Sequence, residues 1–279
     1  MQDKELRLLK LTYLITMQCN LNCKLCTEDI ARFRKENRML PNLTVAQLDE
    51  LLEASFDVVD SVKLLHLSGG EPFVHKDLAE MIDHTMRYAD RFDNLMVFTN
   101  GTIPMRQELY DVFKKYGNKI ILHATDYGFY SDKFERLMEQ VKDTGIIIRR
   151  RHYHEDEAEF GGWVDLGDYE CHGRSEEEKE AVFAACGIVK DMKGNWRTRD
   201  GKLHWCSRSL CGTEQGLIPS VANKDYVDLL DKNMTREEKR EAIRNLMKVK
   251  TIEACNYCSG DFGTTDMSKR HRPAEQEEM

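Results

Sequence analysis

Hydrophobic residues in the first half of the chain fall in short runs separated by amphipathic segments. The runs have the length of buried strands and lie at residues 11–17, 62–67, 95–99, 119–125 and 145–150. Between them, apolar residues recur at helical spacing in segments 44–56, 76–89, 104–116 and 131–144. This alternation predicts a parallel β-sheet with right-handed helical crossovers.

The number of predicted elements limits the architecture. Five strands and four helices are too few for a complete eight-stranded (β/α) barrel. We therefore expect an α/β fold in which about five or six parallel strands form a partial, TIM-like barrel. Thr44 stands where an N-cap residue would begin the first of the four helices.

The pattern changes after about residue 155. Short apolar segments at 188–192 and 203–206 flank a Gly-Asn turn and predict a small hairpin. Thr235, with Glu238 three residues later, predicts a capped helix over 235–249. The expected organisation is a partial-barrel core, a small C-terminal domain and a charged, disordered tail, at residues 8–155, 156–262 and 263–279.

Charge and hydropathy narrow the possible partners. Acidic residues outnumber basic ones by 49 to 41, which opposes sequence-independent binding to nucleic acid. The 279 residues contain no apolar run long enough to span a membrane, and the first residues lack the pattern of a signal peptide. We expect a cytoplasmic protein whose nine cysteines serve metal binding or catalysis.

The first cysteine set follows the first predicted strand. Cys19, Cys23 and Cys26 are spaced so that a loop can wrap three sulfurs around one iron–sulfur cubane. Three thiolates leave the fourth iron open for chemistry. A zinc site is the alternative for this motif taken alone, although zinc usually needs a second pair of ligands.

The first motif is joined by a second one after the second strand. The CX3CX2C run, followed by Ser68-Gly69-Gly70-Glu71-Pro72, resembles the radical S-adenosylmethionine (SAM) enzymes. This resemblance implies a [4Fe–4S] cluster on Cys19, Cys23 and Cys26 whose open iron binds the methionine end of SAM. It also implies that the segment Ser68 to Glu71 contacts the methionine ammonium.

The resemblance extends to the ends of later strands. Thr99 and Asn100 stand where the family approaches the SAM ribose, and Asp126 follows the fourth strand as a further cofactor-binding candidate. Arg151 is a catalytic candidate for proton handling, together with His152. Leu25 replaces the aromatic residue that commonly precedes the third cysteine in the family.

The second cysteine set resembles the twitch version of the C-terminal SPASM module. That resemblance implies an auxiliary [4Fe–4S] cluster on four cysteines, namely Cys186, Cys206, Cys255 and Cys258. A structural zinc with four thiolates is the alternative. Cys171 and Cys211 are either replacement ligands, unligated thiols, or a thiol that donates a hydrogen atom to a substrate radical.

The implied activity is that of a radical SAM oxidoreductase or epimerase. Reductive cleavage of SAM gives a 5′-deoxyadenosyl radical, which abstracts hydrogen from the substrate. The layout resembles enzymes of the 2-deoxy-scyllo-inosamine dehydrogenase type and radical SAM proteins of glycan gene clusters. It favours a carbohydrate-like or nucleotide-sugar substrate, with Trp163, Asp165 and Asp168 as candidate contacts.

The alternative function is peptide modification of the kind that matures ribosomally made peptides. Such enzymes usually carry a peptide-recognition domain ahead of the core, and here the first strand begins within about ten residues of the start. A flavodoxin or ferredoxin is the expected electron donor for either function. A loop without a ligand is the alternative for residues 161–169.

Overall fold

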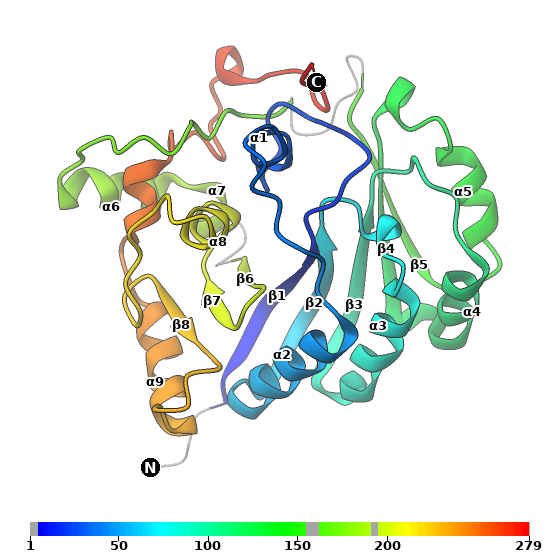
Figure 1. Ribbon diagram of the computed structural model, residues 1–279, viewed down its shortest axis with the longest axis horizontal. Coiled ribbons are helices and arrows are strands. Elements are labelled where there is room, and N and C mark those ends of the chain that lie inside the picture. Colours follow the sequence, from blue (N-terminus) through cyan, green and yellow to red (C-terminus); the bar gives the residue numbers. More distant parts are fainter. Residues whose placement is uncertain (1–4, 155–161, 191–194, 279) are drawn as a thin grey trace. The chain divides into compact units, whose positions relative to one another are not determined.

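The computed structural model describes residues 5–154, 162–190 and 195–278 (Figure 1). The chain forms two compact units that do not follow its linear order. The barrel unit comprises Tyr13–Asp49, Leu64–Trp163 and His271–Met279. The second unit comprises Met1–Thr12, Glu50–Lys63 and Val164–Arg270. The predicted boundary at residues 155 and 156 lies outside the described residues.

The barrel unit is built on a parallel sheet. Its strands are β1 (Arg7–Thr16), β2 (Ser61–Gly69), β3 (Phe92–Thr99), β4 (Ile120–Asp126) and β5 (Ile147–His152), of which β1 and β2 begin in the second unit. They are ordered β5-β4-β3-β2-β1. The pairs β3–β4 and β4–β5 are parallel. The predicted α/β fold with a partial TIM-like barrel is confirmed.

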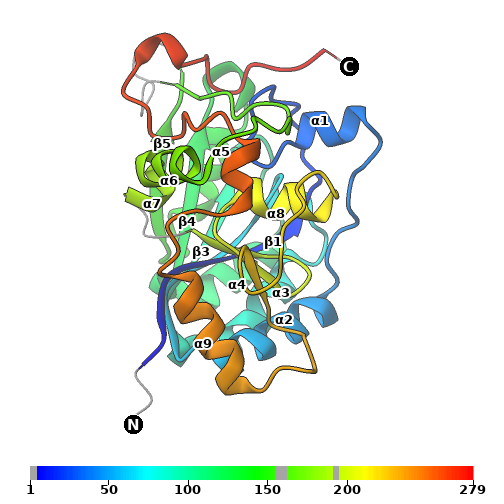
Figure 2. The ribbon, with the colours of Figure 1, turned by 90° about the vertical axis from the view of Figure 1, so that its left-hand side faces the viewer.

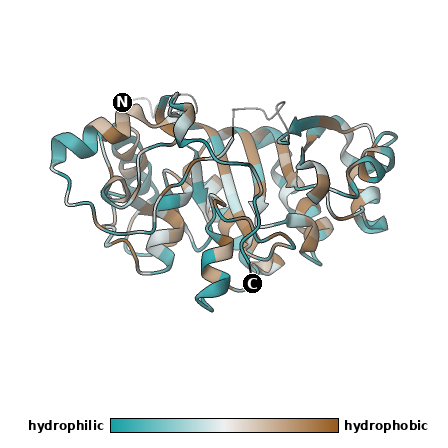
Figure 3. Ribbon diagram, turned by 90° about the horizontal axis from the view of Figure 1, so that it is seen from above, coloured by the Kyte–Doolittle hydropathy of each residue, from teal (hydrophilic) through white to brown (hydrophobic). Residues whose placement is uncertain are grey.

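Helices connect these strands in sequence. They are α1 (Ile30–Lys35), α2 (Val45–Val58), α3 (Leu78–Thr85), α4 (Gln107–Tyr116) and α5 (Phe134–Val141), with short 3-10 turns η1 (Pro72–Val74), η2 (Met86–Arg91), η3 (Gly117–Lys119) and η4 (Gly128–Tyr130). Thr44 caps α2 as expected, because its hydroxyl accepts the Gln47 N–H at 3.2 Å. Helix ribbons carry both hydrophilic and hydrophobic bands, as an amphipathic helix on a buried sheet requires (Figure 3).

The second unit carries three short strands and several helices, of which α6, α7, α8 and α9 are labelled in Figure 2. Its elements are α6 (Glu176–Ala185), α7 (Gly187–Lys190), β6 (Trp196–Thr198), β7 (Lys202–His204), α8 (Ser207–Glu214), β8 (Tyr226–Asp228), α9 (Arg236–Leu246), η7 (Glu253–Tyr257) and η8 (Met267–Lys269). β6 pairs with β7 and β7 with β8, both antiparallel. None of the helices described is long and apolar enough to cross a bilayer.

Three features differ from the sequence expectations. The hairpin is formed by residues 196–204 and turns at 199–201, where Gly201 has φ +96°. The expected first arm at 188–192 was wrong, because residues 188–190 belong to a helix (Gly187–Lys190), and residues 191–194 lie outside the described residues. The acidic stretch at 175–180 begins helix α6, which Ser175 and Glu178 close with a capping box. The expected disordered tail instead pairs with the cysteine loop, since the Lys24 N–H donates to the Glu275 carbonyl at 2.8 Å.

A buried arginine fastens α9 within the second unit. The Arg240 guanidinium donates to both carboxylate oxygens of Asp60, at 2.8 and 3.1 Å, and to the Val58 carbonyl at 2.6 Å. The Leu6 N–H also donates to Asp60, at 2.6 Å. The Arg240 hydrogen bonds lower the pKa of Asp60 below its ordinary value. Because Arg240 is 2 % exposed, the Asp60 carboxylate compensates a buried positive charge.

We predict that Asp60→Ala destabilises the protein by about 3–5 kcal/mol, because it removes the carboxylate that makes two hydrogen bonds with the buried Arg240 charge. Denaturant unfolding of the purified protein measures this loss. Asp57→Ala is the matched control, since Asp57 lies 4.0 Å from Arg236 at the surface and should change the free energy of unfolding by less than about 1 kcal/mol. Equal losses in the two variants would contradict the assignment.

Candidate active site

The turn after β2 lies directly against the turn after β1. The Gly70 N–H donates to the Thr16 carbonyl at 2.9 Å, and the Glu71 N–H donates to the Gln18 carbonyl at 2.8 Å. A Cβ on Gly69 would meet the Thr16 oxygen at 2.1 Å, and one on Gly70 would meet the Gln18 oxygen at 2.3 Å. Glycine is therefore required at both positions for the backbones to approach.

Glu71 joins the ends of β2 and β3 through its side chain. Its carboxylate accepts the Asn100 N–H at 2.6 Å and the Phe73 N–H at 2.9 Å. Burial raises the pKa of Glu71 to about 7, while hydrogen bonds from Asn100, Phe73 and Thr99 act against this rise. Because the carboxylate accepts these hydrogen bonds, the Glu71 side chain organises the site, and the backbone carbonyls of this segment are also acceptors of the kind that an ammonium group needs.

The first cysteine set lies in the loop that follows β1. Arg34 fixes this loop, because its guanidinium donates to the Cys19 carbonyl at 2.6 Å and to the Asn22 side chain at 2.8 Å. The Gln276 amide donates to the Cys23 sulfur at 3.4 Å, and the Asn100 amide lies 3.8 Å from the Cys19 sulfur. Amide donors around sulfur are typical of iron–sulfur ligands, whose potential they adjust.

Burial and mutual repulsion govern the chemistry of these thiols. Burial raises the pKa of Cys19 to about 12, and it also raises the pKa of Cys23 and Cys26. The charge of Cys23 adds to the rise in pKa at Cys19 and at Cys26. A metal cluster would convert buried neutral thiols into thiolates by supplying positive charge, so the donor set fits the expected group.

Tyr127 directly follows β4 and interacts electrostatically with the first cysteine set. Burial raises the pKa of its hydroxyl well above the ordinary value, and the charges of Cys23, Cys26 and Cys19 add to this effect. Its ring meets Trp163 edge-on, with centroids 5.7 Å apart. Trp163 is thus packed against Tyr127. Tyr127 stands beside the predicted Asp126 in the sequence, but it carried no motif that singled it out.

The other predicted site residues lie at the carboxyl ends of their strands. Ser68 and Thr99 are buried at the ends of β2 and β3, and Asn100 follows β3. Arg151 lies on β5 opposite Thr125. Successive residues of a strand face opposite sides, so Arg151 lies on the other side of the sheet from His152 and its partner Asp126.

The second cysteine set converges on one apolar cavity in the second unit. Cys186 ends α6, Cys206 begins α8, and Cys255 and Cys258 lie in and after η7. All four line the cavity, together with large apolar side chains such as Phe183, Trp205, Ile252 and Phe262. Of the cysteines that the structure describes in this unit, Cys171 and Cys211 do not line it. Assigning a cluster to the four sulfurs remains a prediction.

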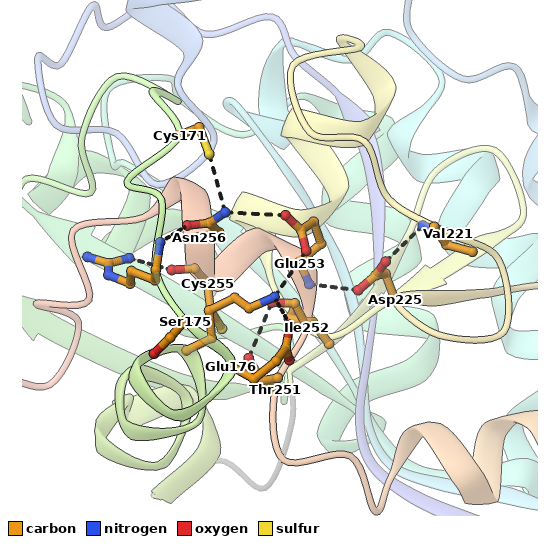
Figure 4. A network of polar contacts seen from close by, with 12 residues as sticks. Cys171, Ser175, Glu176, Val221, Asp225, Thr251, Ile252, Glu253, Cys255 and Asn256 are labelled. Atoms are coloured by element: carbon orange, nitrogen blue, oxygen red, sulfur yellow. Dashed lines mark hydrogen bonds and ion pairs between the residues drawn. The ribbon is translucent and has the colours of Figure 1, made fainter.

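A polar network holds the backbone around Cys255 (Figure 4). The Arg174 guanidinium donates to the carbonyls of Cys255 and Cys258, and the Arg174 N–H donates to the Asn256 side chain at 2.9 Å. The Asn256 amide in turn donates to the exposed Cys171 sulfur at 3.3 Å. Cys171 therefore belongs to the frame around the second cysteine set.

Loop carboxylates in this unit have local partners. The Asp165 carboxylate accepts the Gly167 N–H at 2.8 Å, and the Asp168 carboxylate accepts the Glu170 N–H at 3.0 Å. Both are short-range turn contacts of the kind that Asp makes two residues ahead. The geometry of these two residues is thus accounted for by the loop itself, and their predicted contact with a sugar remains untested.

A family model for the radical SAM superfamily matches residues 13–152, which is half of the chain. The chain belongs to this superfamily, whose standard cofactors are a [4Fe–4S] cluster and SAM. The matched residues contain the first cysteine set, the Gly69-Gly70-Glu71 segment and the ends of β3 and β4.

Curated relatives align with parts of the chain. The antilisterial bacteriocin subtilosin biosynthesis protein AlbA of Bacillus subtilis is 31% identical over 111 residues, covering 40% of this chain and 22% of AlbA. The S-adenosylmethionine-dependent nucleotide dehydratase of Selenomonas ruminantium is 28% identical over 95 residues, covering 34% of this chain and 31% of that protein. The alignments with five curated relatives cover between 22% and 31% of the length of each relative.

Two solved structures resemble the fold over nearly the whole chain. BtrN, in complex with AdoMet and 2-DOIA, has a TM-score of 0.50 and 14% identity, covering 93% of this chain and 96% of BtrN. The enzyme anSMEcpe, with bound AdoMet and Cp18Cys peptide, has a TM-score of 0.53 and 13% identity, covering 95% of this chain and 86% of that one. At such identities the likeness concerns the fold alone.

We predict that Gly70→Ala disturbs the cysteine loop, because the new methyl group would lie 2.3 Å from the Gln18 carbonyl and 3.0 Å from the Cys19 Cβ. It should destabilise the protein by about 1–3 kcal/mol and reduce the iron bound after anaerobic reconstitution. Gly145→Ala is the control for iron content, since its Cβ would meet no atom closer than 3.8 Å and the substitution adds only the backbone strain of alanine at φ +77°. A normal iron content in Gly70→Ala would show that the close approach is dispensable.

We predict that Glu71 makes stability depend on pH. Its folded-state pKa of about 7 exceeds the ordinary 4.5, so the folded state binds more protons between these values. The free energy of unfolding should therefore fall by up to about 3 kcal/mol as pH rises from 4.5 to 7 and then level off. Glu71→Gln should remove this component, and the exposed Glu108→Gln should retain it. Anaerobic urea unfolding at pH 5 and pH 8 measures the difference between the variants.

Proposed function

We propose that the protein is a radical SAM enzyme that removes hydrogen from a carbohydrate-like or nucleotide-sugar substrate, giving dehydrogenation or epimerisation. The observation that carries this proposal is the convergence of Cys186, Cys206, Cys255 and Cys258 on one cavity. Four thiolates leave a [4Fe–4S] cluster without an open iron, which suits electron transfer. A hydrogen atom and then an electron and a proton leave the substrate in a dehydrogenation.

Under this proposal, the residues of the first site would have separate roles. Cys19, Cys23 and Cys26 would hold the first [4Fe–4S] cluster, which with SAM supplies a 5′-deoxyadenosyl radical. Gly69 and Gly70 bring the backbone close to the cysteine loop, and Glu71 holds the ends of β2 and β3 in register for it. The fixed geometry lets the site orient its cofactor without rearrangement.

Substrate handling falls to residues on the strand ends. We assign proton handling to Arg151, which lies at the end of β5 opposite Thr125. On the same side of the sheet, the rings of His66, Phe98 and His123 follow one another at centroid distances of 5.2 and 4.9 Å. A ring column of this kind suits the apolar face of a sugar or base.

The choice of a sugar-like substrate is supported by the full-length likeness to BtrN, which was crystallised with 2-DOIA. Peptide modification is the second candidate. It is favoured by the similarly extensive likeness to anSMEcpe with its Cp18Cys peptide and by the local identity to AlbA. A flavodoxin or ferredoxin remains the proposed electron donor for both.

We predict that the anaerobically reconstituted protein binds about eight irons and, with dithionite and SAM, forms 5′-deoxyadenosine. Cys19→Ala should lose about four irons and all 5′-deoxyadenosine formation. Cys255→Ala should lose about four irons yet retain cleavage of SAM, because the first cluster would be intact. Iron analysis and chromatography measure both outcomes, and a colourless protein that binds zinc in place of iron would refute the proposal.

Product mass decides among the reactions. The reconstituted enzyme is incubated with two groups of candidate substrates. One group contains nucleotide sugars and aminocyclitols, and the other contains short synthetic peptides. Loss of two hydrogens from a sugar indicates dehydrogenation. An unchanged mass in H2O, with a gain of one dalton when the reaction is run in D2O, indicates epimerisation. Turnover of peptides alone would replace the sugar assignment by the peptide one.

A further inference from the structure

Asp126 and His152, the sequence candidates for cofactor binding and proton handling, form a cluster with His154. Asp126 ends β4 and His152 ends β5, and the parallel register places the two residues opposite each other. His154 follows two residues later. The Tyr153 N–H donates to the Asp126 carbonyl at 2.9 Å, which continues the pairing beyond the strand and brings His154 back toward Asp126.

The distances within this cluster are those of ligands around a metal ion. The Asp126 Oδ2 atom lies 3.4 Å from His152 Nδ1 and 3.5 Å from His154 Nε2. The three ligand atoms all lie within 4.8 Å of one another. Ligands held about 2.0–2.1 Å from a tetrahedral zinc ion are about 3.3–3.4 Å apart. Direct charge-assisted hydrogen bonds are shorter, at about 2.7–2.9 Å.

The surrounding backbone orients these ligands. The Gly128 N–H donates to Asp126 Oδ1 at 2.8 Å, so the second oxygen of the carboxylate is directed toward the two imidazoles. Gly128 has φ +62°, and a Cβ there would lie 3.0 Å from the Cβ and Cγ of His154. The glycine thus allows His154 to approach. A hydrogen bond to a ligating carboxylate is a usual feature of metal sites.

We propose that Asp126, His152 and His154 bind a single divalent transition-metal ion. Two imidazoles and one carboxylate are ligands that suit zinc or ferrous iron. Two neutral imidazoles and one carboxylate carry one negative charge, which suits a doubly charged ion with nitrogen and oxygen ligands. Three protein ligands leave an open coordination position for water or another oxygen donor. This site uses none of the nine cysteines, so its metal binding can be tested whether or not either iron–sulfur cluster forms.

Zinc K-edge X-ray absorption on the reconstituted holoprotein tests the site, because bound iron does not obscure that edge. One equivalent of Zn²⁺ should show nitrogen and oxygen neighbours at about 2.0–2.1 Å, and sulfur at about 2.3 Å should be absent. His152→Ala and His154→Ala should each weaken zinc binding by more than about 100-fold in equilibrium dialysis, since loss of an outer partner alone costs roughly 10–100-fold. Gly128→Ala should weaken it less.

His84→Ala is the matched control. His84 also faces a carboxylate, with its Nδ1 atom 2.8 Å from Asp49, but it belongs to a different part of the barrel unit. It should leave the zinc affinity unchanged, and the three histidine variants should keep the wild-type iron content. A sulfur shell around zinc, or the same zinc affinity in His152→Ala as in the wild type, would overturn the proposal. If no iron–sulfur cluster forms, the zinc test still applies to the protein as purified.

Discussion

The barrel unit depends on one close approach between backbones, where the turn after β2 meets the turn after β1. Two hydrogen bonds from Gly70 and Glu71 extend the parallel pairing beyond the strands. This contact places the segment beside the base of the cysteine loop. The buried carboxylate of Glu71 then adds β3 to the same arrangement through Asn100. A cofactor that bridges the loop and the strand ends would find both already fixed.

The sequence predicted most of the parallel sheet because buried parallel strands are written as uninterrupted apolar runs. Leu95, Val97, Ile120 and Leu122 are examples, and all are inaccessible to solvent. The strands β6, β7 and β8 were harder to predict from the sequence, since strands of three residues are too short for a periodic hydrophobic pattern. Helix α6 was not predicted, because its first residues are mostly glutamates and show no apolar periodicity. The capping pair Ser175 and Glu178 nevertheless marks its start.

For the candidate sites, local motifs predicted residues that lie close together in the chain. The cysteine loop and the Gly69-Gly70-Glu71 segment are of this kind. Partners distant in sequence left no such signal: Gln276 reaches the Cys23 sulfur across 253 residues, and Arg174 reaches the carbonyl of Cys258 across 84. The pairing of Asp126 with His152 depends on the register between two strands, which apolar runs alone do not specify.

The segment near the end of the chain has a consequence for how the first site is assembled. Residues 275–277 bridge to Asn22, Cys23 and Lys24 through backbone hydrogen bonds and an amide. A ribosome delivers the cysteine loop long before it delivers these residues. Iron that bound during early synthesis would therefore bind to a loop that still lacks its contacts with residues 275–277. The environment of Cys23 is complete only after residues 275–277 have been synthesised, so a cluster bound earlier would lack these contacts.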